Sequence, residues 1–237
     1  MSTQKFETNA LHAGHDVTKT AGTRAVPIYQ TSSYVFNNSE HAANVFSLAE
    51  PGFIYTRLNN PTNDILEQRL ATLEGGIGAV VTASGTAAIA TALLVLLKAG
   101  DHLVASNSLY GGTYNLFNVT LPRLGIKTTF VDPSDPSNFK NAVQDNTRAF
   151  FVESLGNPKL DVLDLKSISN EAKPAKVPFI VDNTVASPYL LNPIQHGADI
   201  VVHSLTKYIT GNGTSLGGVI IDAGNFDWSN GKFPEFT

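Results

Sequence analysis

Hydrophobic and polar positions are spaced differently before and after residue 60. Residues 1–60 show little periodicity and are rich in Thr, Asn, Ser and aromatic residues. This pattern predicts an extended arm that packs on another surface, because so many aromatic side chains argue against a disordered tail. After residue 60 the spacing becomes regular. We therefore expect a boundary there, with residues 61–237 forming the main domain.

Short apolar runs alternate with helical patterns over residues 61–237. The apolar runs predict strands at 79–83, 102–105, 127–131, 149–153, 179–181, 200–202 and 218–221. Helical spacing of apolar residues predicts helices at 62–73, 85–98, 112–121, 137–144 and 163–172. Alternating strands and helices are typical of an α/β fold, in which helices cover both faces of a parallel or mostly parallel sheet.

Composition narrows the class of protein. The chain has 237 residues, of which 42% are hydrophobic and 15% charged, so it can bury a sizeable core. Its net charge of −4 argues against nucleic acid as the main partner. It has no cysteine, which excludes disulfides and a cysteine nucleophile and fits a cytoplasmic location. His12 and His15 have metal-like spacing without a further ligand cluster, so we expect no metal site.

The sequence contains no evident export or membrane segment. Residues 1–7 lack the apolar stretch of a signal peptide. The longest apolar run, 87–97, is interrupted by Thr91 and is too short to cross a bilayer. We therefore expect no membrane partner.

Polar residues gather where the predicted strands end, and Lys207 is the most informative of them. The run 199–203 predicts a buried strand, and Ser204, Thr206 and Lys207 follow it. Ligands bind at the carboxyl ends of such strands in open α/β sheets. Desolvation among apolar walls would lower the pKa of a lysine there, and a neutral amine can form a Schiff base. Together with phosphate-binding hydroxyls this suggests pyridoxal 5′-phosphate (PLP); a solvated surface lysine is the alternative.

Two other strand ends carry residues that suit this cofactor. Gly85 and Thr86 open a predicted helix, whose free N–H groups favour an anion such as a phosphate. An ordinary serine cap on a buried helix, formed by Ser84, is the alternative. Asp182 ends the run 178–181, and a protonated pyridine nitrogen would supply the partner that a buried carboxylate needs. A cap on a helix or turn is the alternative.

Three weaker signals complete this set. Asn157 can bind a ring oxygen or a substrate carboxylate, although Asn before Pro is also a turn signal. Tyr110 can stack on a flat ring, or it is a packed loop aromatic. Arg57, two residues after Tyr55 in the arm, can clamp a phosphate, or it is a surface arginine. Their joint occurrence with the strand-end residues favours a PLP site.

With these residues the chain resembles the Cys/Met-metabolism family of PLP enzymes, which have the aspartate-aminotransferase-type fold (fold type I). The matching segments follow the order of that family and cover nearly the whole chain: 25–32, 55–62, 84–88, 109–113, 181–184 and 204–208. Within the family, residues 11–14, 54–57, 203–207 and the Gly-rich segment 213–218 are similar to O-acetylhomoserine sulfhydrylases. Methionine γ-lyases commonly carry Cys at the position of Gly112, which counts against that activity.

The resemblance implies a role for each candidate residue. It implies that Lys207 is the Schiff-base lysine and also moves the Cα proton, that Tyr110 stacks on the ring and acts as an acid or base, and that Asp182 pairs with the pyridine nitrogen. It implies phosphate contacts from Gly85, Thr86, Ser204 and Thr206, and from Tyr55 and Arg57 donated to the neighbouring subunit's site. Asn157 would bind the ring oxygen or the substrate carboxylate. The arm, 1–60, would thus contact a second subunit, and we expect a homotetramer, a dimer of dimers with shared active sites.

The implied activity is a transferase reaction of methionine biosynthesis: γ-replacement on O-acetylhomoserine with sulfide or a thiol, giving homocysteine or methionine plus acetate. Two alternatives stay open, namely a cystathionine γ-synthase, cystathionine γ-lyase or methionine γ-lyase activity, and a non-catalytic PLP-binding subunit. Family members continue into a smaller C-terminal domain that supplies an arginine for the substrate carboxylate. Residues 61–237 would be the PLP-binding large domain with that C-terminal domain missing. Asn212 also departs from the His or Gln common at its position.

Overall fold

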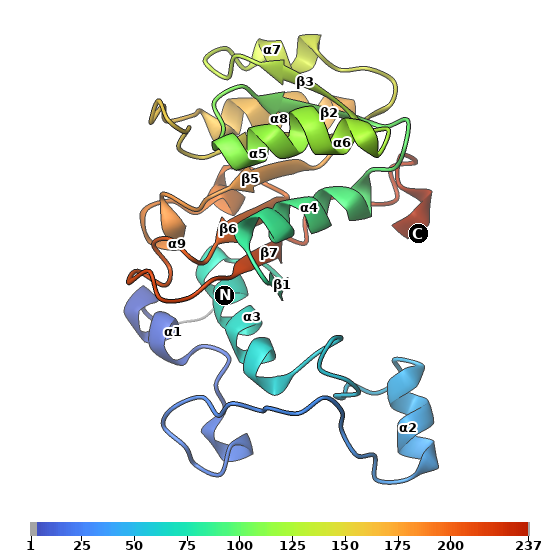
Figure 1. Cartoon of the computed structure of the whole chain (residues 1–237), viewed down its shortest axis with the longest axis vertical. Coiled ribbons are helices and arrows are strands. Elements are labelled where there is room, and N and C mark those ends of the chain that lie inside the picture. Colours follow the sequence, from blue (N-terminus) through green and yellow to red (C-terminus); the bar gives the residue numbers. More distant parts are fainter. Residues whose placement is uncertain (1–3, 237) are drawn as a thin grey trace. The chain divides into compact units, whose positions relative to one another are not determined.

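A computed structural model describes residues 4–236 of the chain (Figure 1). The chain forms two compact units, one ending at Leu70 and one beginning at Ala71, so the division falls inside helix α3 (Pro61–Glu74). No helix within residues 4–236 combines the length and hydrophobicity needed to cross a membrane.

The first unit is more helical than its sequence pattern predicts. It contains α1 (Phe6–His12), a 3₁₀ turn (Val17–Lys19), α2 (Ser39–Phe46) and most of α3. Asn38 caps α2, because its side chain accepts a hydrogen bond from the His41 N–H. The extended segment before α2 is tied to α3 through Thr62, whose hydroxyl donates to the Pro27 carbonyl over 3.0 Å. The first unit is therefore partly helical and has its own hydrogen bonds.

The second unit is built on a seven-stranded sheet with the order β1-β7-β6-β5-β4-β2-β3. Its strands are β1 (Gly78–Thr82), β2 (His102–Ser106), β3 (Lys127–Val131), β4 (Thr147–Glu153), β5 (Phe179–Asp182), β6 (Ile200–Ser204) and β7 (Gly218–Asp222). Strands β3, β2, β4, β5 and β6 are parallel, whereas β7 lies antiparallel between β6 and β1. The predicted mostly parallel sheet is confirmed.

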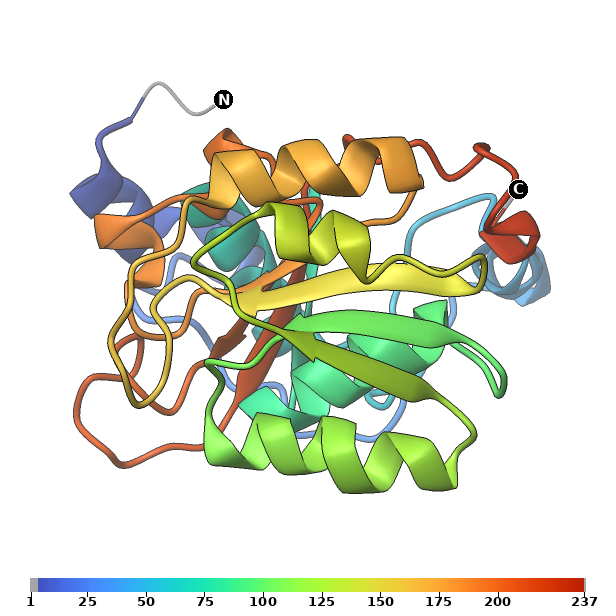
Figure 2. The same ribbon diagram turned by 90° about the horizontal axis from the view of Figure 1, so that it is seen from above.

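Helices cover both faces of this sheet. The helices are α4 (Gly85–Leu96), α5 (Gly111–Asn115), a π turn (Leu116–Thr120), α6 (Leu121–Arg123), α7 (Ser137–Asn141), α8 (Leu165–Ala175), α9 (Ser187–Leu190) and 3₁₀ turns at Pro193–His196 and Pro234–Phe236. Figure 2 shows α8 and α7 on one side of the sheet and α4, α5 and α6 on the other. The single helix predicted at 112–121 is thus three short segments joined through a π turn.

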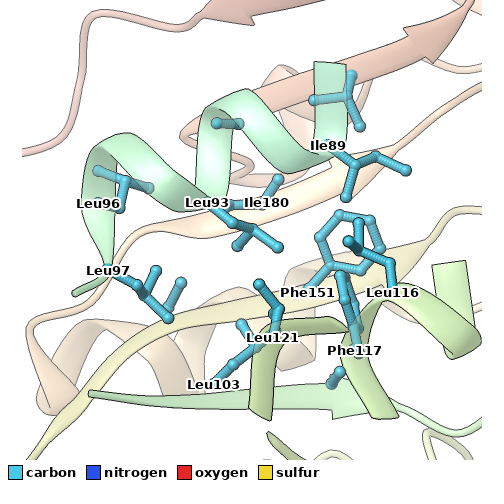
Figure 3. Close-up of a cluster of buried hydrophobic side chains, with 14 of the residues drawn as sticks. Ile89, Leu93, Leu96, Leu97, Leu103, Leu116, Phe117, Leu121, Phe151 and Ile180 are labelled. Carbon is cyan, nitrogen blue, oxygen red and sulfur yellow. The ribbon is translucent and has the colours of Figure 1, made fainter. Parts of the chain in front are cut away.

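The main core lies under α4 (Figure 3). Leu93 and Leu96 of this helix pack with Phe117 and with side chains of the central strands. Phe117 meets Phe151 of β4 edge to face, with ring centroids 5.0 Å apart. Both rings are fully buried, so the packing fixes the π turn that carries Phe117 against β4.

Candidate cofactor site

Three adjacent parallel strands end on polar side chains that share one cavity. Glu153, Asp182 and Ser204 are the last residues of β4, β5 and β6. Side chains alternate along a strand, and Phe151, Ile180 and Val202, two positions earlier, all belong to the core under α4. The three polar groups therefore project from that same face. They line a cavity of about 420 Å³, a size typical of small-molecule sites.

The start of α4 forms one wall of this cavity. Ser84 caps the helix by accepting a hydrogen bond from the Ala87 N–H over 3.1 Å, so the capping alternative for Ser84 holds. Gly85 and Thr86 nevertheless line the cavity. A Cβ on Gly85 would lie 2.5 Å from the Ser204 Cβ and 2.8 Å from its Cα. Only glycine lets the helix N-terminus approach β6 this closely, and its free N–H groups favour an anion.

Lys207 and Thr206 reach the cavity from the loop after β6. The Lys207 side chain is exposed, which differs from the expectation of an amine enclosed by apolar walls. The reason is local, since residues 205–210 form turns beyond the end of the strand and are not part of the sheet. Thr206 is half-buried and accepts a hydrogen bond from the Gly217 N–H. The loop thus offers one exposed amine beside a hydrogen-bonded hydroxyl.

Asp182 is held by a short relay of hydrogen bonds. Its Oδ1 accepts from the Thr184 hydroxyl over 2.5 Å and from the Thr184 N–H over 3.0 Å. The Thr184 Oγ1 in turn accepts from the Ser204 N–H over 2.7 Å, which links the turn to β6. Asp182, the last residue of β5, therefore caps the turn that follows, as its alternative interpretation holds, and it also lines the cavity. Burial raises the pKa of Asp182, while Thr184 and His203 lower it.

Glu153 lies beside Asp182 and was not singled out from the sequence. The two residues are register partners on β4 and β5, and both line the cavity. The Glu153 Oε1 accepts a hydrogen bond from the Tyr110 N–H over 2.7 Å. Burial, together with the charge of Asp182, raises the pKa of Glu153 to about 8. The strand-end rule that identified Asp182 applies equally to Glu153 and could have found it.

Tyr110 and Asn157 also line the cavity. The Tyr110 ring is about half exposed, and its Cε1 lies 2.5 Å from where a Cβ on Gly112 would be. Gly112 therefore leaves space for this ring. Asn157 is half-buried at the cavity edge, and its peptide bond to Pro158 is cis.

Tyr55 and Arg57 belong to the first unit. The Arg57 guanidinium lies over the Tyr55 ring, 5.5 Å from its centroid, and both residues line an open cavity together with Thr31 and Asn60. Their assignment to a neighbouring subunit's phosphate site stays a prediction.

The residues of the second unit fit PLP by their chemistry. The strand-end cavity holds the primary amine of Lys207, a helix N-terminus cleared by Gly85, and the Asp182 carboxylate with Glu153 beside it. Within residues 4–236, both hydrogen bonds to that carboxylate reach Oδ1 of Asp182. A cationic ring N–H would supply the partner that opposes its desolvation. No cluster of three or more metal-ligating side chains occurs in the same described range.

Known proteins match this chain over most of its length. It is 60% identical to an O-acetyl-L-homoserine sulfhydrylase of Leptospira meyeri over 233 residues, which are 98% of this chain and 53% of the relative. It is 52% identical to a homocysteine synthase of Schizosaccharomyces pombe, covering 100% of this chain and 56% of the relative. The chain thus spans about half the length of the curated relatives it matches.

Solved structures agree with this match. A putative O-acetylhomoserine (thiol)-lyase from Campylobacter jejuni, containing N′-pyridoxyl-lysine-5′-monophosphate, superposes with a TM-score of 0.91 at 44% identity, over 94% of this chain and 55% of that one. A cystathionine γ-lyase from Lactobacillus plantarum, complexed with L-serine, gives 0.84 at 35% identity, over 92% of this chain and 55% of that one. These neighbours confirm the predicted fold class. Residues 7–234 match the Cys/Met metabolism PLP-dependent enzyme family, and the chain belongs to that family.

Proposed function

We propose that this protein is a PLP-dependent transferase that replaces the acetate of O-acetylhomoserine with sulfide or a thiol, giving homocysteine or methionine. The observation that carries the proposal is the convergence of Lys207, Asp182 and Gly85 on one cavity at the carboxyl edge of the sheet. The names of the similar proteins, O-acetyl-L-homoserine sulfhydrylase and homocysteine synthase, support the choice of substrate.

In this proposal Lys207 has two tasks. Its amine would hold the cofactor covalently, and the same amine, when free, would take the proton from the substrate Cα. Bound PLP supplies an electron sink for the charge that this proton leaves behind. Exposure of Lys207 suits the second task, because a side chain that is not packed can move between two positions.

Asp182 and Tyr110 act on the ring in different ways. The Asp182 carboxylate, oriented by Thr184, holds a proton on the ring nitrogen by pairing with it. Tyr110 stacks on the ring face, and its hydroxyl moves a proton near the leaving group. The Glu153 carboxyl fixes the Tyr110 backbone, so the stacking residue is tied to the end of β4.

The phosphate group would be held at the α4 N-terminus. Gly85 and Thr86 offer backbone N–H groups there. Ser204, which lies directly against Gly85, and Thr206 offer hydroxyls from the end of β6 and the loop that follows it. Tyr55 and Arg57 of a neighbouring copy would complete the phosphate site, which makes at least a dimer part of the proposal. A homotetramer and a cytoplasmic location stay predictions.

A lyase is the second candidate, because a cystathionine γ-lyase is among the similar structures. Gly112 counts against a methionine γ-lyase, because those enzymes commonly carry Cys at this position. Product analysis separates the two. Homocysteine or a new thioether with acetate means replacement, whereas ammonia and a 2-oxo acid mean elimination.

The cofactor assignment is tested by trapping. The protein is incubated with PLP, reduced with borohydride and mapped by peptide mass spectrometry. We expect a pyridoxyl group on Lys207 and its loss in Lys207→Ala. Lys159→Ala, an exposed lysine outside the cavity, is the matched control and should retain the label. A label that persists at the same level in Lys207→Ala would refute the assignment. Labelling without turnover of any amino acid would instead favour a non-catalytic PLP-binding subunit.

A further inference from the structure

A chain of buried polar side chains lies one residue away from the cavity on each of the three central strands. Ser154 follows Glu153, Asn183 follows Asp182, and His203 precedes Ser204. Because neighbouring side chains on a strand point to opposite faces, His203 projects away from the cavity side. None of the three lines the cavity, and all are at most 2% exposed.

Glu74, the last residue of α3, joins this chain together. The His203 Nε2 lies 2.6 Å from the Glu74 Oε1, and the Asn183 amide donates to the same oxygen over 3.1 Å. The Ser154 hydroxyl donates to the Asn183 Oδ1 over 2.8 Å. The four side chains, which we call the Glu74 network, therefore connect the carboxyl ends of β4, β5 and β6 beneath the site.

The position of Glu74 is unfavourable for stability alone. Its side chain is completely buried, and within residues 4–236 its ion-pair partner is a histidine, not a lysine or arginine. It also ends a helix, where the macrodipole disfavours a negative charge. The Glu74 Oε2 and the His203 Nδ1 are both buried without a hydrogen-bond partner. Unfavourable charges and unpaired polar atoms in the interior are expected where a functional site requires them.

We propose that Glu74 and His203 are positioning residues that hold the ends of β4, β5 and β6 in the geometry that binds the cofactor. The link to the site is direct, because the three strand residues of the network, Ser154, Asn183 and His203, each adjoin a cavity residue in the chain. The Ser204 N–H, next to His203, also donates to the Thr184 hydroxyl that orients Asp182. A shift of His203 would therefore change both the cavity wall and the direction of the Asp182 carboxylate. This inference rests on the proposed PLP site.

The structure offers a matched control for the loss of a buried histidine. His102 is 1% exposed, as His203 is, and its ring nitrogens lie 2.8 Å from the Thr147 and Thr129 hydroxyls. It is the first residue of β2, at the amino edge of the sheet, whereas the cavity lies at the carboxyl ends of the strands. Replacing either histidine with alanine removes a buried ring, but only one replacement touches the Glu74 network.

The experiment measures the dissociation constant of PLP and the free energy of unfolding for wild type, His203→Ala, His102→Ala, Glu74→Ala and Glu74→Gln. We expect both histidine variants to be destabilised, while only His203→Ala and Glu74→Ala raise the PLP dissociation constant by about tenfold or more, as loss of supporting residues does at metal sites. Glu74→Gln keeps a carbonyl that accepts from His203 and Asn183. It should therefore bind PLP within about threefold of wild type.

Two results would overturn the proposal. One is a PLP dissociation constant for His203→Ala within about twofold of that for His102→Ala; the other is equal damage from Glu74→Gln and Glu74→Ala. If both alanine variants fail to fold, Ser154→Ala tests the same network by removing one hydroxyl, and an unchanged affinity in it counts against the proposal. Failure of wild type to bind PLP would refute the proposed function instead, so the two failures are distinguishable.

Discussion

The carboxyl of Glu153 makes the stability of this protein depend on pH in an unusual direction. Its pKa is raised to about 8 from the ordinary 4.5, mainly by burial. The folded state therefore holds this proton more tightly than the unfolded state does. The stabilisation is fully present below pH 4.5 and is lost as the pH rises through about 8, which is opposite to the behaviour of a salt-bridged carboxylate.

Glu153→Gln removes this dependence with little change in shape. The Gln carbonyl can still accept the hydrogen bond from the Tyr110 N–H, and the amide is neutral at every pH. One proton bound only by the folded state changes the free energy of unfolding by about 1.4 kcal/mol per pH unit. Over two units, from about pH 5.5 to 7.5, the variant should gain about 3 kcal/mol relative to wild type.

Urea unfolding of the PLP-free protein at several pH values measures this difference. Asp199→Asn is a useful comparison, because burial raises the pKa of Asp199 only to about 6 and its carboxylate accepts the Phe179 N–H. Its gain over wild type should level off above pH 6, whereas the gain of Glu153→Gln continues to about pH 8. Parallel curves for wild type and Glu153→Gln between pH 5.5 and 7.5 would refute the reasoning.

Two further changes test the site wall and the core. Gly85→Ala places a Cβ 2.5 Å from the Ser204 Cβ, so we expect about 1–3 kcal/mol lower stability and about tenfold weaker PLP binding. Calorimetry and PLP titration measure these two effects. Gly111→Ala is the control, because its Cβ meets nothing within 4 Å. Equal PLP affinities in the two variants would contradict this account of the α4 N-terminus. Phe117→Ala deletes a fully buried ring and should cost about 3–5 kcal/mol in urea unfolding. A loss below about 1 kcal/mol would contradict the packing described for the π turn and β4.

The sequence predicts the central strands well because their apolar runs are long enough to be unambiguous. Residues 149–153 and 200–202, for example, lie within β4 and β6. The same reasoning misses α1 and α2 because both helices are short. The Asn38 side chain caps α2, whereas α1 has no side-chain cap. It also gives no strand order, and the antiparallel β7 is set by long-range pairing that no local pattern encodes.

The parts of the candidate site that lie at or just after the end of a buried strand could be predicted from the sequence. Polar residues after a buried strand identified Asp182, Ser204 and Lys207, and all three line the cavity. The rule does not reveal that Lys207 is exposed, because exposure depends on how the loop after β6 folds. The contact between Glu74 and His203 could not be predicted from the sequence, because it joins residues 129 positions apart.

The place of β7 in the sheet has a consequence for how the protein is made. β1 and β6 do not pair with each other, because β7 lies between them in the sheet. β7 comes about 135 residues after β1 in the chain. Until residues 218–222 leave the ribosome, β1 and β6 each present a row of unpaired backbone groups, and α4 packs on an incomplete sheet. We expect such nascent chains to be aggregation-prone, and a chaperone that shields the edge of β6 would act before the last strand is inserted.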